Sequence, residues 1–172
     1  MKKGLAVGLA LLVCFLIQTG VLPALGESSI APDLILVVLI PAAVLWKAVP
    51  VAFMGAAVGV VIDVLFGRGI GLYAIPYLVF PWVIGVYGRQ FFHENALIPA
   101  ILAGVCHLLS QVFTALAIYL GRMELAITGE LLLRTLASVL FTAGLTVPSY
   151  LLMFGFINRR EKRRPGVIMI GR

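Results

Sequence analysis

The feature that most constrains this chain is a series of long apolar blocks that charged residues hardly interrupt. Hydrophobic residues make up 62% of its 172 positions and charged residues 12%. A soluble domain carries roughly a quarter charged residues, about twice that share. In hydrocarbon the backbone has to satisfy its own hydrogen bonds, so such blocks predict transmembrane helices. We therefore expect an all-α integral membrane protein.

Six blocks can each form a separate helix. At about 20 residues per span, a chain of this length has room for six helices joined by short loops. The blocks cover residues 5–22, 34–46, 51–66, 70–88, 96–120 and 130–157. The first block is longer than a usual signal-peptide core, so an uncleaved helix is expected. The sequence predicts a six-helix transmembrane domain over residues 1–158 and a basic cytoplasmic tail over residues 159–172.

The positions of the basic residues predict the orientation. Two of the blocks, 34–46 and 51–66, are short, and reading them as one bent segment would give five spans. Six spans put Lys2, Lys3, Lys47 and the basic tail on one side of the membrane, which the positive-inside rule identifies as the cytoplasm. Five spans would send the tail across the membrane. We therefore expect both termini to be cytoplasmic in a multi-pass protein of the bacterial inner membrane.

The tail also indicates which partners to expect. Six of the thirteen basic residues lie within its fourteen positions, directly after an apolar block. A cluster in this place is typical of a topology anchor that also meets anionic membrane lipid. We therefore expect lipid, and not nucleic acid, to be its partner.

Small residues recur at every fourth position in the third block. Gly55, Gly59 and Asp63 fall on one stripe of a helix, and Gly67 and Gly71 continue the spacing. Small residues allow another helix to approach closely in a membrane. The stripe could pack against a helix of the same chain or form a contact surface for another membrane protein.

Charged residues inside or near the apolar blocks require partners. A carboxylate in hydrocarbon is costly, so Asp63 should face protein, water or a cation. Arg68 and Arg134 are the cations expected on the same side of the membrane, and we predict that Asp63 pairs with one of them. Asp33 precedes the second block, where an acidic side chain suits the positive end of a helix.

Polar side chains on the last two blocks have two possible roles. His107 and Gln111 lie one turn apart and could bind a metal or relay protons, but a hydrogen-bonding role in packing is the preferred interpretation. Hydroxyl groups near one face of block 130–157 favour packing over a substrate cavity. No catalytic motif is present, and Asp63 with His107 is the only candidate reactive pair. We expect a non-enzyme without metal or cofactor.

The order of these features resembles the MreD family of bacterial rod-shape-determining proteins. Three features carry the resemblance: the run from Pro32 to Leu36, the stripe from Gly55 to Gly71, and the aromatic helix that contains Tyr73, Tyr77 and Trp82. The resemblance implies a scaffold in side-wall peptidoglycan synthesis that binds MreC and associates with RodA and a class B penicillin-binding transpeptidase. It supplies no catalytic residues, and self-association is left open.

The resemblance also implies a fold and a rival function. MreD-like proteins are similar in fold to the substrate-binding subunits of energy-coupling-factor vitamin transporters. A protein of that second kind would need an enclosed polar pocket lined by aromatic groups. If the family role applies, the expected partner surface is the glycine stripe together with Asp33 and Asp63.

Overall fold

The computed structural model describes residues 2–21, 31–66, 71–88, 96–120 and 129–161. Within these ranges every regular element is a helix and none is a strand, which confirms the all-α prediction. The helices are α1 (Lys2–Leu16), the π-helical turn η1 (Ile17–Val21), α3 (Leu34–Leu45), α4 (Ala48–Phe66), α5 (Ala74–Tyr87), α6 (Leu97–Leu120) and α7 (Gly129–Glu161).

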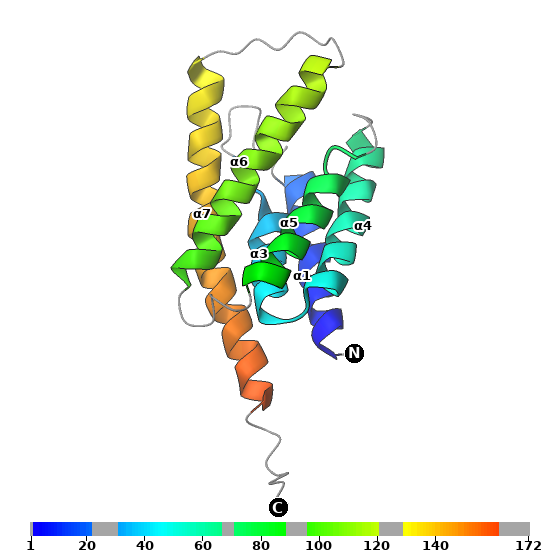
Figure 1. Ribbon diagram of the computed structural model, residues 1–172, viewed down its shortest axis with the longest axis vertical. Helices are drawn as coiled ribbons and strands as arrows, with labels where there is room; N and C mark the ends of the chain where they lie inside the picture. The colour runs from blue at the N-terminus through cyan, green and yellow to red at the C-terminus, as the bar shows by residue number, and fades with distance from the viewer. Residues whose placement is uncertain (1, 22–30, 67–70, 89–95, 121–128, 162–172) are drawn as a thin grey trace, which may run out of the picture.

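The helices run alternately up and down through one bundle (Figure 1). Helix α1 begins and α7 ends at the lower end of the bundle in this view. The helical hairpin of α6 and α7 rises beyond the upper ends of α4 and α5.

Helix α3 is the core of the bundle. All residues from Ile35 to Val44 are buried, and α3 contacts α1, α4, α5, α6 and α7. A helix that is apolar on every side can be stable only when other helices surround it. Its 12 residues span only about 18 Å, so it is much shorter than a hydrocarbon layer.

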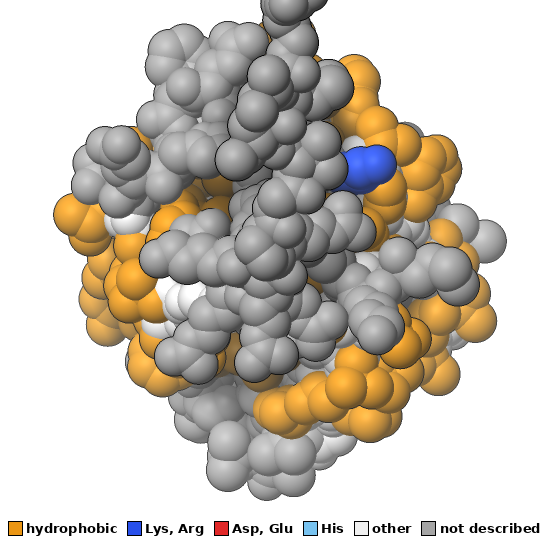
Figure 2. Space-filling model, turned by 90° about the horizontal axis from the view of Figure 1, so that it is seen from below, with side chains coloured by type: hydrophobic (Ala, Val, Ile, Leu, Met, Phe, Trp, Pro, Cys, Tyr) orange, Lys and Arg blue, Asp and Glu red, His pale blue; other side chains and the backbone are white. Residues whose placement is uncertain are grey.

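Three helical segments are long and apolar enough to cross a membrane: Ala48–Phe66, Leu97–Ala117 and Leu132–Gly155. Three shorter apolar helices accompany them: Gly4–Gly20, Leu34–Leu45 and Ala74–Tyr87. At most a third of each long segment is buried, so most of its apolar side chains point outward. Figure 2 shows apolar side chains around the rim of one end of the bundle. An apolar exterior is what a surrounding bilayer requires.

Two helix starts differ from the prediction. Helix α4 begins at Ala48, three residues early, because Pro50 is tolerated in a first helical turn. Helix α5 begins at Ala74, four residues late, because residues 71–73 form a turn in which Gly71 has a φ of +114°. That backbone conformation favours glycine.

Candidate functional site

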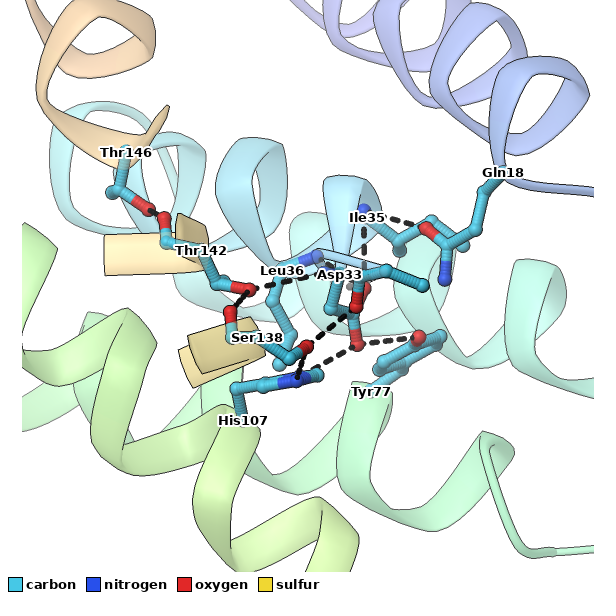
Figure 3. A network of polar contacts seen from close by, with 10 residues as sticks. Gln18, Asp33, Ile35, Leu36, Tyr77, His107, Ser138, Thr142 and Thr146 are labelled. Carbon is cyan, nitrogen blue, oxygen red and sulfur yellow. Dashed lines mark hydrogen bonds and ion pairs between the residues drawn. The ribbon is translucent and has the colours of Figure 1, made fainter. Parts of the chain in front are cut away.

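The buried hydrogen-bonding side chains gather at the N-terminal end of α3 (Figure 3). We call this group the polar centre. Its buried members are Asp33, Tyr77, His107, Ser138 and Thr142. They come from the start of α3 and from α5, α6 and α7, so one cluster joins four segments of the bundle.

Asp33 is the acceptor at the middle of the polar centre. One carboxylate oxygen, Oδ1, accepts hydrogen bonds from the backbone N–H groups of Ile35 and Leu36, both at 3.1 Å, and so caps α3. The other oxygen, Oδ2, accepts from the hydroxyl group of Tyr77 at 2.8 Å. The start of α3 therefore forms a charge-assisted contact with α5.

Helix α7 binds the same segment through hydroxyl groups. Thr142 Oγ1 accepts from the N–H of Asp33 at 3.0 Å and donates to the carbonyl of Ser138 at 2.8 Å. Ser138 Oγ donates to the carbonyl of Ala31 at 2.5 Å. One turn along α7, Thr146 Oγ1 donates to the carbonyl of Thr142 at 2.7 Å. The polar face predicted for this helix thus packs against α3.

The hydrogen bonds of Ser138 indicate that Nε2 of His107 is the donor in the contact between the two side chains. The single hydroxyl hydrogen of Ser138 is used on Ala31, so its oxygen accepts from His107 Nε2 at 2.9 Å. The other ring nitrogen, Nδ1, lies 3.7 Å from Asp33 Oδ2, which is beyond hydrogen-bonding distance. His107 therefore connects α6 to α7 directly and faces the carboxylate of α3.

The π-helical turn brings the first helix to the polar centre. Gln18 lies in η1, and its Oε1 accepts from the N–H of Ile35 at 3.3 Å. Inserted π turns occur often at functional positions, where they redirect a side chain. Here the turn adds α1 to the segments that the polar centre joins.

A second buried carboxylate fixes the start of α5. Asp63 Oδ2 accepts from the N–H groups of Gly71 at 2.8 Å and Ala74 at 3.2 Å, and Oδ1 accepts from that of Tyr73 at 2.9 Å. The hydrogen-bond partners of Asp63 among the described residues are backbone amides. Asp63 does pin its helix to the next one, by capping the start of α5. Arg68 lies outside the described residues.

The glycine stripe is an internal packing surface. A Cβ atom on Gly59 would lie 2.6 Å from the Cα of Ala74, and one on Gly55 would overlap the backbone of Tyr77. Both glycines and Asp63 are buried against α5. The packing alternative therefore describes Gly55 and Gly59, and they offer no exposed surface to a partner. Gly67 lies outside the described residues.

The remaining predicted residues separate into buried and exposed positions. His107 is buried but Gln111 is exposed, so the two do not act as a pair. Arg134 is also exposed. The two members of the candidate reactive pair, Asp63 and His107, have different partners. His107 lies beside Asp33, whereas the hydrogen bonds of Asp63 go to the start of α5. In the part of the chain that the structure describes, no three histidine, cysteine or acidic side chains form a metal-binding group.

The meeting of Asp33, Tyr77 and His107 (Figure 3) is not predicted by the sequence. They are separated by 44 and 30 positions in the chain: Asp33 directly precedes the second block, and Tyr77 and His107 lie in the fourth and fifth. The available signal is that an acid, a phenol and a histidine each stand in an apolar block or at its end, where a polar group needs a partner. With the acceptor positions of Asp33 occupied by amides and a hydroxyl group, the arrangement is suited to holding helices together.

These features define an all-helical membrane protein in which buried polar side chains join the helices. The family model described as rod shape-determining protein MreD matches residues 3–160. The chain belongs to the MreD family, a family of rod-shape-determining bacterial membrane proteins that is not a known enzyme family. No curated protein and no solved structure matches the chain. Similarity to the transporter subunits therefore stays a prediction.

Proposed function

We propose that this protein is a non-enzymatic scaffold subunit of the machinery that inserts side-wall peptidoglycan in rod-shaped bacteria. In this role it binds MreC and associates with RodA and a class B penicillin-binding transpeptidase. The observation that carries the proposal is the family match over residues 3–160. The distribution of polar groups agrees with it, because the described polar side chains with buried contacts hold the bundle together.

The exterior supports action through lateral contacts. Large apolar side chains are exposed on every helix except the core helix α3, for example Leu9, Phe53, Leu109 and Leu152. A chain with little mass outside its helices can meet a membrane partner mainly through such faces. In the proposed topology all six helices are membrane-embedded, and both termini are cytoplasmic.

Site-specific photocrosslinking in the native bacterium tests the proposal. A photoreactive residue is placed at one exposed position on each of the helices α1, α4, α6 and α7, at Leu9, Phe53, Leu109 or Leu152. We expect one or two of these positions to capture a single-span, coiled-coil protein, and the other positions serve as matched controls. Capture of ATPase subunits would instead support the vitamin-transporter alternative and overturn the proposal.

Cell shape provides the second test. Depletion of the protein should make rod-shaped cells round, and the wild-type chain should restore the rod. Cells that keep a normal shape after depletion would contradict the proposed role. Reporter fusions at residues 1 and 172 test the topology, because both should report the cytoplasm.

A further inference from the structure

The exposed apolar surface has different heights on two sides of the bundle. On α5, the large exposed aliphatic side chains begin at Ile75 and end at Val86. These eleven residue steps correspond to about 16 Å along a helix. On α6 the corresponding surface begins at Leu97 and ends at Leu120, a distance of about 35 Å.

Contacts with α4 fix the position of α5 along the bundle. Lys47 is exposed immediately before α4, and Asp63 lies sixteen residue steps later, or about 24 Å along the helix. Asp63 binds the amides at the start of α5. Near the other end of α5, Gly85 packs against Ala48, with 2.8 Å between a Cβ built on the glycine and the Cα of Ala48. Helix α5 therefore extends between the levels of Asp63 and Lys47.

On the long side, helices α6 and α7 carry no charged residue over a longer distance. Helix α6 contains no Asp, Glu, Lys or Arg. Helix α7 contains none between Arg134 and Arg159, which are separated by about 37 Å along the helix. Figure 1 shows the same difference, because the α6–α7 hairpin extends beyond α4 and α5.

Helix tilt can match the height of the α6 surface to the hydrocarbon thickness, but it cannot do so for the α5 surface. A tilt of about 30° reduces the height of the α6 surface to about 30 Å, which matches a typical hydrocarbon layer. Tilting α5 makes its surface still shorter. The exposed apolar surface of α4 runs from Val49 to Phe66, about 26 Å, so the shortfall against the same layer is confined to α5 and amounts to about 14 Å.

We infer that lipid covers the α5 face and that the protein locally thins the bilayer on this side. A shorter apolar surface can be accommodated by compressing the adjacent lipid chains. A transmembrane helix from another protein needs about 20 apolar residues and would extend beyond the α5 surface at its ends. Thin bilayer therefore fits the face better than a full-length span. This membrane-shaping activity does not depend on the partners proposed above.

Spin-label depth measurements test the inference with matched pairs of positions. Cys14 and Cys106 are first replaced by alanine, and single cysteines are then labelled with a nitroxide at Ile75, Val86, Ile101 or Val112. Both pairs are separated by eleven residues, and all four side chains are exposed. The pair on α6 is the control for the pair on α5. Circular dichroism and a monodisperse elution profile show that each labelled chain is folded.

Depth is measured in dioleoyl phospholipid vesicles from the relaxation caused by oxygen and by a water-soluble nickel complex. In a flat layer of about 30 Å, two positions about 16 Å apart have depths that add up to about 14 Å. We expect this sum or slightly more for the α6 pair, because tilt shortens its separation across the layer, and about half of it or less for the α5 pair. In the shorter dimyristoleoyl lipids the difference between the pairs should shrink.

Two results would overturn the inference. Equal depth sums for the two pairs would mean that the bilayer is not thinned beside α5. Labels at Ile75 and Val86 that neither oxygen nor nickel reaches would mean that a second copy of the chain, and not lipid, covers the face. Depth sums that differ as stated while the photocrosslinking experiment fails would support the thinning alone.

Discussion

Replacement of Asp33 by alanine should substantially destabilise the bundle. The substitution removes the cap of α3, which is worth about 1 kcal/mol. It also leaves the hydroxyl group of Tyr77 without its acceptor in a position that is 0% exposed. A buried hydroxyl group that loses its partner costs about 1–3 kcal/mol. We expect the free energy of unfolding to fall by about 2–4 kcal/mol.

Two milder variants separate these contributions. Asp33→Asn keeps one oxygen for the amides of α3, and its NH₂ group can donate to Tyr77, so a loss of about 1 kcal/mol is expected. Tyr77→Phe removes a single hydrogen bond and keeps the ring. Hydrogen bonds of this type are worth about 1.5–3 kcal/mol to a charged acceptor and about 0.6 kcal/mol on average in a membrane protein. We expect about 1–2 kcal/mol for this variant.

The assay is reversible unfolding in mixed micelles, in which the denaturing detergent is titrated and helix content is followed by circular dichroism. Leu152→Ala is the matched control, because Leu152 is 76% exposed and should be nearly neutral. The double variant of Asp33→Ala and Tyr77→Phe should be less destabilised than the sum of the single variants by about 1 kcal/mol. Strict additivity, or an Asp33→Ala variant as stable as Leu152→Ala, would refute the role assigned to the polar centre.

Three further predictions use the same unfolding assay. Gly59→Ala should cost 2 kcal/mol or more, roughly the scale of overpacking, whereas Gly144→Ala should be nearly neutral because no atom lies within 4 Å of its added Cβ. Asp63→Asn should cost about 2 kcal/mol, because an amide cannot accept all three N–H groups; no loss of stability would contradict the capping role. His107→Ala should cost about 1–3 kcal/mol and Gln111→Ala almost nothing, and equal effects would contradict their different burial.

Much of the fold follows from the sequence because hydrocarbon restricts the possible structures. The helices, their approximate ends and the role of Asp33 at the start of a helix were predicted from apolar blocks and one acidic residue. In a membrane, backbone hydrogen bonds must be made within each segment, so block length largely determines the element. The ends are harder to predict: α5 starts late because a distant carboxylate holds the turn before it.

The partners of the two carboxylates could not be predicted in the same way. The sequence suggests Arg68 and Arg134 as partners of Asp63, because charged residues and their expected side of the membrane can be read from a sequence. Backbone amides at a helix start are equally good partners for a carboxylate, but every helix has them, so they give no distinguishing signal. The contact between Asp33 and Tyr77 depends on how α5 packs against α3, which requires the three-dimensional arrangement.

The polar centre and the apolar exterior place different demands on the same chain. Five segments of the bundle contribute side chains that bind the start of α3 or one another, so changes there should reduce the amount of folded protein before they affect any partner. The outward faces of α6 and α7 contribute little to this network and are free to meet lipid or another helix. Variants on those faces can therefore alter cell shape at normal protein levels, whereas variants in the polar centre should alter shape only as the protein is lost.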